Sequence, residues 1–186
     1  MKRLFDLLLA LIVAIFCIVP ILLIAVAVKL SSKGPVLYWS DRVGRRNGIF
    51  KMPKFRSMRV DTPAVATHLL SNPEAYLTPV GSFLRRSSLD ELPQLWSIII
   101  GDMSFVGPRP ALFNQEDLIA LRTARGVHDL VPGLTGWAQV NGRDELPIPE
   151  KVNLDAEYMN RRSMLFDMKI LWMTLVKVLN REGVSH

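Results

Sequence analysis

The sequence contains a single cysteine, Cys17, so it has no disulfide framework. Cys17 lies in an apolar segment, which leaves the rest of the chain without a thiol and fits a cytosolic body. The three histidines, His68, His128 and His186, have no metal-ligand spacing with one another or with Cys17. This absence argues against a structural zinc site. The sequence also lacks a Walker loop, a GxGxxG motif after a strand and a GxSxG elbow, which removes three frequent nucleotide-binding and hydrolase motifs.

Charge is absent from residues 7 to 28 and concentrated in the rest of the chain. The 186 residues are 49% hydrophobic and 22% charged, which excludes a largely disordered chain and indicates one domain with an appendage. We therefore divide the chain into a segment 1–30 and a body 31–186. The net charge of +6 favours a polyanionic partner: nucleic acid, a phosphorylated small molecule or an anionic membrane surface. Because the basic residues are not interleaved with aromatics as in RNA-binding strands, nucleic acid is the weaker choice.

The uncharged segment is long enough for a bilayer but is interrupted by Pro20. Its 22 residues would form a helix of roughly 33 Å. Pro20 removes one backbone donor and its ring clashes with the carbonyl of Phe16, which predicts a kink. The two arms, 7–19 and 21–28, are each too short to span a bilayer alone.

The flanks of this segment leave three interpretations open. Lys2 and Arg3 precede it and Lys29 and Lys33 follow it, so the positive-inside rule does not separate its two ends. A kinked spanning anchor is one interpretation. A re-entrant helix that enters and leaves on the same membrane face is the second. A signal peptide with a cleavage site at residues 25–27 is the third.

The body shows short elements separated by turn residues. Two apolar runs, residues 36–39 and 49–50, flank Asn47-Gly48 and predict a β-hairpin. Residues 61–80 predict an irregular loop or short helical turns, and residues 92–100 a short apolar element that ends at Gly101. Residues 111–125 predict an exposed helix that stops at Gly126. An apolar stripe at helical spacing predicts a last helix; its members are Leu165, Met168, Leu171, Trp172, Leu175, Val176 and Leu179. That stripe is typical of a core-facing helix, and an interfacial membrane helix is the alternative.

The densest group of chemically capable residues is RRSSLDELPQ, residues 85–94. Asp90 and Glu91 come just before Pro93, a residue that is tolerated in the first turn of a helix. Helix N-termini favour ionised carboxylates and bound phosphates. The structural alternative is a capping box formed by Ser88 and Glu91, with Asp90 only complementing the helix dipole.

Basic residues in three further motifs are candidates for phosphate binding. Arg109 stands between two prolines in GDMSFVGPRP, and a guanidinium on such a stiff backbone suits bidentate phosphate recognition. Arg143 follows the Gly-rich PGLTGWAQVNG, and KFRSM contains Lys54 and Arg56. Each of these cations taken alone is equally well explained as a solvated surface group.

Taken in order, the Pro-broken N-terminal segment, KFRSM, RRSSLDELPQL, GDMSFVGPRP and PGLTGWAQVNGR resemble the monotopic phosphoglycosyl transferases, the bacterial sugar transferase family. The resemblance runs from about residue 2 to residue 180. It implies a helix-dominated α/β fold that is not a standard Rossmann fold, with a β-hairpin and interfacial amphipathic helices. It implies a re-entrant membrane helix over 1–30, kinked at Pro20, and a catalytic domain over 31–186 on the cytoplasmic face of the bacterial inner membrane.

The activity that the resemblance implies is transfer of a sugar 1-phosphate from a UDP-sugar to undecaprenyl phosphate, with release of UMP. The family forms a covalent phosphosugar-aspartate intermediate in a ping-pong mechanism, uses Mg²⁺ and starts glycoconjugate synthesis. Short members favour an N-acetylated UDP-sugar. No nucleic-acid partner is implied. The alternative from another class is a noncatalytic membrane-anchored basic module that binds anionic lipid or nucleic acid.

The family's functional residues fall on specific positions of this sequence. The aspartate nucleophile, which also binds Mg²⁺, corresponds to Asp90, and the neighbouring Glu91 is expected to assist deprotonation of the polyprenyl phosphate. Positions near phosphates correspond to Lys54, Arg85 and Arg109, and a position linked to the nucleotide sugar corresponds to Arg143. Departures from the family pattern occur at positions 19, 41, 96–97 and 131, and none affects the two carboxylates.

Overall fold

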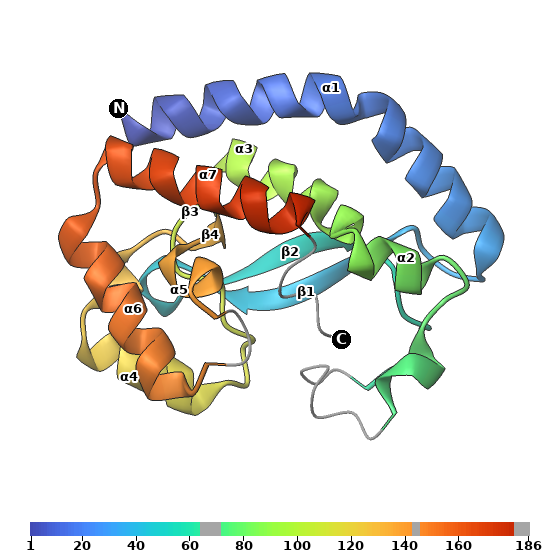
Figure 1. Ribbon diagram of the computed structural model, residues 1–186. Helices are drawn as coiled ribbons and strands as arrows, with labels where there is room; N and C mark the ends of the chain where they lie inside the picture. The colour runs from blue at the N-terminus through green and yellow to red at the C-terminus, as the bar shows by residue number, and fades with distance from the viewer. Residues whose placement is uncertain (64–71, 143–145, 181–186) are drawn as a thin grey trace.

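The computed structural model describes residues 1–63, 72–142 and 146–180, and helices dominate it (Figure 1). The α-helices are α1 Lys2–Ser31, α2 Gly81–Arg86, α3 Leu95–Ile100, α4 Glu116–Ala124, α5 Trp137–Val140, α6 Ile148–Arg161 and α7 Met164–Leu179. Short 3-10 helices are η1 Arg45–Asn47, η3 Pro73–Tyr76, η4 Leu89–Gln94 and η5 Val127–Asp129. The strands are β1 Leu37–Val43, β2 Ile49–Phe55, β3 Ser104–Val106 and β4 Gly133–Thr135.

The strands form two small sheets. β1 and β2 pair antiparallel from Leu37 opposite Phe55 to Val43 opposite Ile49, which confirms the predicted hairpin. Its turn passes through η1, where Arg46 and Asn47 have φ of 55° and 59°. β3 and β4 form a parallel pair. The two sheets have two strands each among the described residues, in agreement with a fold other than the doubly wound Rossmann sheet.

Helix α1 runs without interruption from Lys2 to Ser31 with Pro20 inside it. In Figure 1 its course curves over the rest of the molecule. By length and composition α1 could cross a membrane, and it is the one helix in the described part of the chain that meets those criteria. The sharp kink at Pro20 and the re-entrant course remain predictions.

Both halves of α1 nevertheless pack against the body along one side. Ala10 is fully buried in the main core, where it joins Ile98 of α3 and Ile170 of α7. Val28 is fully buried in a second cluster with Phe55 and Leu84. Most of the large apolar side chains of α1 remain exposed, which is typical of a helix that faces lipid on its other sides.

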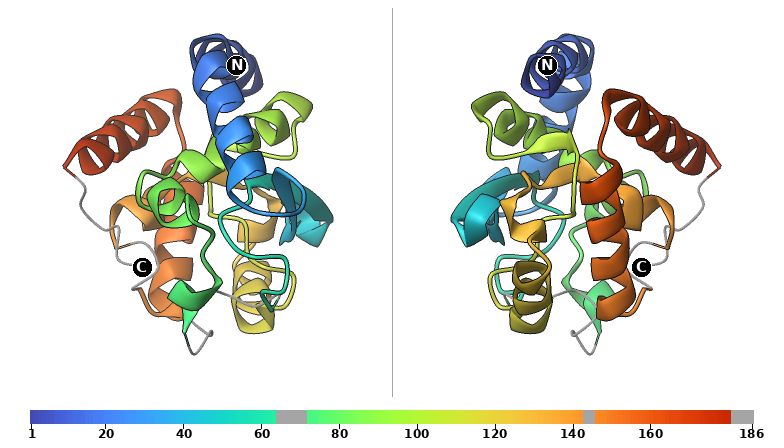
Figure 2. Two further views of the ribbon diagram at one scale, coloured as in Figure 1. Left: turned by 90° about the vertical axis from the view of Figure 1, so that its right-hand side faces the viewer. Right: turned by 90° about the vertical axis from the view of Figure 1, so that its left-hand side faces the viewer.

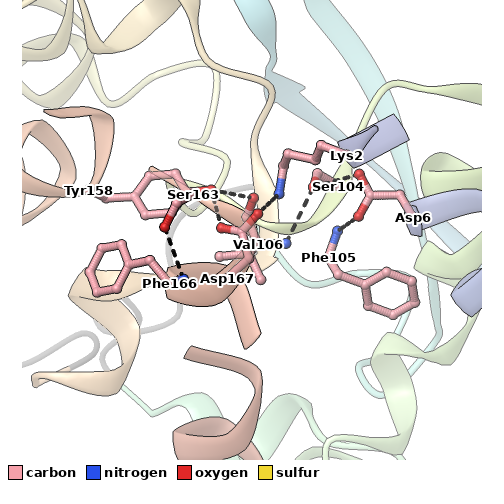
Figure 3. A network of polar contacts seen from close by, with 9 residues as sticks. All are labelled: Lys2, Asp6, Ser104, Phe105, Val106, Tyr158, Ser163, Phe166 and Asp167. Atoms are coloured by element: carbon pink, nitrogen blue, oxygen red, sulfur yellow. Dashed lines mark hydrogen bonds and ion pairs between the residues drawn. The ribbon is translucent and has the colours of Figure 1, made fainter. Parts of the chain in front are cut away.

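A polar network joins the N-terminal end of α1 to the body (Figure 3). Lys2 Nζ donates to Asp167 Oδ2 of α7 at 2.6 Å, and the hydroxyl of Tyr158 donates to Asp167 Oδ1 at 2.7 Å. One turn later in α1, Asp6 accepts hydrogen bonds from Ser104 Oγ at 2.9 Å and from the backbone N–H of Phe105 at 3.2 Å. Asp6 and Asp167 are each 3% exposed, so both buried carboxylates have the partners that burial demands.

The last helix turns a different face to the core from the one predicted. Leu165 and Trp172 of the predicted stripe are 83% and 66% exposed. The buried residues of α7 are instead Phe166, Asp167 and Ile170. The core-facing interpretation of the stripe is therefore wrong. The reason is that α7 has apolar residues on more than one face, so spacing alone did not show which face meets the core.

The most apolar helices lie together on one side of the molecule. Figures 1 and 2 show α1, α3 and α7 on one side and α4 on the opposite side. Besides the apolar side chains of α1, Trp96 and Ile100 of α3 and Trp172 of α7 are exposed. The three helices that lie together thus all carry exposed large apolar side chains.

Candidate active site

Asp90 and Glu91 lie in the first turn of η4, directly after α2. Ser88, which precedes this turn, has a φ of 56°, and its side chain accepts no capping hydrogen bond. The capping-box alternative is therefore wrong, because a serine in the left-handed conformation does not direct its hydroxyl to the turn that follows. Pro93 lies inside the same short helix.

Glu91 is held between cations from two other parts of the chain. Lys54 Nζ, at the end of β2, lies 2.8 Å from Glu91 Oε1, and Arg109 Nη2 lies 3.4 Å from the same oxygen. The side chains of Lys54 and Glu91 are 17% and 20% exposed. At such partial burial an ion pair is screened less by water and salt than a surface pair is.

Asp90 is the more buried carboxylate, with 8% of the residue exposed. Burial raises the pKa of its carboxyl above the ordinary value, and the negative charge of Glu91 adds to this effect. Lys54, Arg85 and Arg109 oppose it with their positive charges. The structure thus brings together five of the six residues that the sequence predicted for catalysis and phosphate binding.

Arg85 reaches this group from the last turn of α2, where its Nη1 also lies 3.4 Å from the sulfur of Met58. The sixth predicted residue, Arg143, falls outside the described residues, and its role remains a prediction. Arg56 of the KFRSM motif lies elsewhere: it is 4% exposed and donates to the carbonyl and hydroxyl oxygens of Ser32, just after α1.

The loop that carries Arg109 is fixed through its backbone carbonyls. The carbonyl of Pro108 accepts from Gly133 N at 2.9 Å, and that of Pro110 accepts from Arg42 Nη1 at 3.3 Å. The carbonyl of Ala111 accepts from the backbone N–H of Val43 at 2.9 Å. Proline has no N–H to donate, so these carbonyl bonds add to the one N–H bond from Gly107 to the carbonyl of Thr135, at 2.9 Å, in joining the loop to its neighbours.

Glycines allow this loop to approach β4 closely. A side-chain carbon at Gly107 would lie 2.4 Å from the carbonyl oxygen of Val131, and one at Gly133 would lie 2.1 Å from the nitrogen of Gly107. Neither contact is sterically possible, since backbone atoms would have to move. The Gly-rich motif after residue 131 therefore has a packing role that supports the Arg109 loop.

The donor set at this site suits magnesium when a phosphate substrate is present. Among the described residues no group of three or more His, Cys, Asp or Glu side chains could hold a metal ion. Mg²⁺ is ordinarily bound through one or two carboxylates together with substrate phosphates and water. Asp90 offers such a carboxylate beside cations that attract phosphate, so the residues present fit an ion that binds together with a diphosphate.

The chain matches the family model for bacterial sugar transferases over residues 1–181. The chain belongs to the bacterial sugar transferase family. Its members are transferases, and this enzyme shares 40% identity over 186 residues with the uncharacterized sugar transferase EpsL of Bacillus subtilis (strain 168), covering 100% of this chain and 91% of EpsL.

Longer relatives carry more specific names. The UDP-glucose:undecaprenyl-phosphate glucose-1-phosphate transferase of Escherichia coli (strain K12) is 42% identical in an alignment of 185 residues that covers 95% of this chain and 40% of that protein. The UDP-galactose-lipid carrier transferase of Erwinia amylovora is 36% identical in an alignment of 202 residues that covers 98% of this chain and 41% of that protein. This sugar transferase thus spans about two fifths of the length of these two relatives.

Sequence reasoning missed a buried ion pair near the site, between Arg122 Nη2 of α4 and Asp155 Oδ2 of α6 at 2.6 Å. Arg122 was placed in an exposed helix, yet it is 8% exposed, and Asp155 of α6 is 1% exposed. The one local signal was the spacing of Leu118 and Arg122, which places them on the same face of α4. The sequence had no signal for the partner of Arg122, because α4 and α6 meet only in the folded sugar transferase.

Proposed function

We propose that this protein transfers a sugar 1-phosphate from a UDP-sugar to undecaprenyl phosphate, giving undecaprenyl-diphosphate-sugar and UMP as the first membrane step of glycoconjugate synthesis. The observation that carries the proposal is the buried carboxylate of Asp90, which lies beside Glu91 and within the field of Lys54, Arg85 and Arg109. Three cations around one nucleophilic carboxylate suit a dianionic diphosphate, which would otherwise repel it.

In the first step, an oxygen of Asp90 attacks the β-phosphorus of the UDP-sugar. A bond forms between that oxygen and phosphorus while the bond from phosphorus to the bridging oxygen breaks, and UMP leaves with the electron pair. In the second step, an oxygen of undecaprenyl phosphate attacks the same phosphorus and restores the Asp90 carboxylate. Asp90 would hold Mg²⁺ together with the diphosphate, and the bound ion would neutralise further phosphate charge.

Glu91 changes its partners during this cycle. Its Oε1 accepts from Lys54 and Arg109. The phosphates of the donor compete with Glu91 for these two cations. Release from them leaves the Glu91 carboxylate available to take a proton from the acceptor phosphate. Arg143, which lies outside the described residues, takes part in recognition of the nucleotide sugar, as the resemblance implies.

The identity of the sugar is the least constrained part of the proposal. The resemblance to short family members favours an N-acetylated UDP-sugar. Two of the relatives are instead named for glucose and galactose. A donor panel for this protein therefore contains UDP-glucose, UDP-galactose and their N-acetylated counterparts.

The membrane part of the proposal is that α1 is re-entrant and bends at Pro20 in the inner membrane, with the body on the cytoplasmic face. The helices α1, α3 and α7 lie on one side of the molecule (Figure 2). This arrangement supports the proposal that this side lies in the interface between membrane and water. The Lys side chains of α7 then meet anionic headgroups.

Topology is tested with single cysteines at Leu4 and Lys33 in a Cys17→Ser background, treated with a membrane-impermeant thiol reagent in right-side-out and inverted vesicles. Both positions are expected to react only in inverted vesicles. Reaction of the two positions from opposite faces would show a spanning helix instead.

Activity is tested by UMP release from the donor panel, with undecaprenyl phosphate and MgCl₂, for wild type and Asp90→Asn. Asp117→Asn is the matched control, because Asp117 is an exposed residue of α4. We expect release with one donor, its loss in Asp90→Asn and its retention in the control. Without acceptor, the intact mass of wild type is expected to increase by one phosphosugar. Absence of both release and adduct with every donor would favour the noncatalytic alternative.

A further inference from the structure

In the loop that carries Arg109, the backbone carbonyl of Arg109 accepts a hydrogen bond from the buried guanidinium of Arg122. Arg122 Nη1 donates to the backbone carbonyl oxygen of Arg109 itself at 2.8 Å. The same guanidinium donates through Nε and Nη2 to Asp155 Oδ2, at 2.9 and 2.6 Å. The two side chains of this pair are 9% and 2% exposed, so both charges are out of contact with bulk water.

The geometry of a guanidinium links these contacts. Its five N–H groups lie in one plane at fixed angles, so an acceptor on one edge determines where the other edge points. Asp155 accepts from two nitrogens of Arg122 and thereby sets the orientation of the remaining Nη1. That nitrogen meets the carbonyl of the one residue in the loop whose side chain reaches Glu91.

The prolines on either side of Arg109 do not fix this residue by themselves. They lock their own φ angles, and Pro110 restricts Arg109 to extended conformations, but φ and ψ of Arg109 can still vary within that region. A change in ψ of Arg109 would turn its carbonyl away from Arg122 and alter the position of the Arg109 side chain relative to the rest of the loop. The bond from Arg122 opposes this rotation.

We propose that Arg122, oriented by Asp155, is a positioning residue that holds Arg109 in place for the phosphate of the donor. The inference rests on the proposed function for the role of Arg109, while the fixing of the loop does not depend on it. A small displacement of a phosphate-binding cation is costly in catalysis, since a shift of about 1 Å can cost ~100-fold in rate.

Stability alone does not account for the pair. Replacing a buried ion pair by apolar residues of similar volume is often neutral or stabilising, so such a pair is weak evidence for a stabilising role. Arg122 also donates a hydrogen bond to the carbonyl of Arg109 in the loop. Apolar side chains could not form this bond.

The first test is Arg122→Lys, which keeps a positive charge beside Asp155 but has no planar fork to reach both Asp155 and the Arg109 carbonyl. The control is Arg125→Lys, the same exchange at an exposed position that follows α4. We expect kcat/KM for the donor to fall roughly 10- to 100-fold in Arg122→Lys, with the larger part of the change in KM. The control is expected to remain within about 2-fold of wild type.

A double-mutant cycle with Arg109→Ala shows whether Arg122 acts through Arg109. If it does, Arg122→Lys is expected to have less than about 2-fold further effect on kcat/KM in the Arg109→Ala background. Equal fold-changes in the two backgrounds would overturn the proposal, because they would mean that Arg122 acts independently of Arg109.

Hydrogen exchange provides a readout that does not depend on turnover. In Arg122→Lys the peptide covering residues 104–115 is expected to exchange faster than in wild type and in Arg125→Lys. An unchanged rate of hydrogen exchange in this peptide would show that Arg122 does not fix the loop and would overturn the proposal. A wild-type protein without turnover on any donor would contradict the proposed function, and the exchange result would still decide whether Arg122 fixes the loop.

A second variant covers the case in which Arg122→Lys does not fold. The pair Arg122→Met and Asp155→Leu removes both charges together, so no uncompensated buried charge remains. We expect this variant to unfold near the wild-type temperature and to show the same loss of kcat/KM and the same dependence on Arg109. Wild-type kcat/KM in this folded variant would overturn the proposal.

Discussion

Lys54 Nζ and Glu91 Oε1 lie 2.8 Å apart, and this contact connects the β-hairpin to the turn that carries Asp90 and Glu91. Arg109 shares the same oxygen from a third part of the chain. Under the proposed function, Glu91 and the phosphate of a donor compete for the ammonium group of Lys54. The field of Lys54 also acts on Asp90.

Replacing Lys54 by Met is therefore expected to weaken donor binding. We expect kcat/KM to fall roughly 10- to 100-fold, the range for a lost charge-assisted hydrogen bond, and Lys54→Arg to restore part of it. Steady-state UMP release measures both variants. Lys51→Met is the matched control, because Lys51 is on the same strand and pairs with Asp41 at the exposed surface. A similar loss in both Met variants would show a general effect of hairpin charge.

Asp90→Asn is expected to abolish turnover and to make the protein no less stable at neutral pH. Burial raises the pKa of Asp90 in the folded state, so between the ordinary and the raised value the folded state binds more protons than the unfolded chain. The contribution of this group to stability therefore falls as pH rises through that window. The asparagine side chain does not ionise, so the stability of the variant does not decrease for this reason as pH rises.

Thermal unfolding of wild type and Asp90→Asn in detergent, from about pH 4 to pH 8, measures the effect. The unfolding temperature of the variant minus that of wild type is expected to increase with pH and then level off. A variant that loses stability relative to wild type as pH rises would show that the three cations outweigh burial.

The rate of adduct formation is expected to have an acidic limb set by Asp90, because only the ionised carboxylate attacks phosphorus. Since the pKa of Asp90 is raised, this limb should lie above the pH range of an ordinary aspartate. Higher MgCl₂ concentration should move the limb to lower pH, since a bound cation favours the ionised form. Single-turnover mass measurements without acceptor test this, with NaCl at the same ionic strength as the control. A limb that shifts no further with MgCl₂ than with NaCl would argue against Asp90 as a metal ligand.

Asp167→Ala is expected to lower the free energy of unfolding by about 1–3 kcal/mol, because it removes an acceptor shared by Lys2 and Tyr158 inside the protein. Denaturant titration in detergent measures this change. Asp129→Ala is the control: its ion pair with Arg46 has side chains that are 60% and 73% exposed, and such a pair contributes little. Equal effects would show that the network is not the stabilising element.

The parts of the fold and site that the sequence predicted correctly depend on local chemistry. Turn residues between β-rich runs predicted the hairpin, and adjacent carboxylates before a proline predicted the turn that carries Asp90 and Glu91. Motif resemblance then linked Lys54, Arg85 and Arg109 to the same site, and the structure brings them together.

The parts that the sequence did not predict depend on distant contacts. Ser88 has capping chemistry, yet a positive φ prevents the cap. The stripe on α7 has core spacing, yet contacts of Phe166 and Ile170 select the neighbouring face. The sequence of α4 predicts Arg122 to be a surface residue, whereas in the fold it forms a buried ion pair with Asp155 of α6. In each case tertiary contacts set a conformation or an environment that the local sequence does not show.

The bond between Lys2 and Asp167 has a consequence for the time course of biosynthesis. The two residues are separated by 165 positions, so the start of the chain has left the ribosome long before its partner exists. At synthesis rates of ~5–20 residues per second, the wait is roughly 8 to 33 s. During that interval Lys2 lacks the carboxylate of Asp167, whereas Asp6 gains Ser104 at a separation of only 98 positions. The N-terminal end of α1 is thus joined to the body in two stages, first through Asp6 and β3 and later through Lys2 and α7.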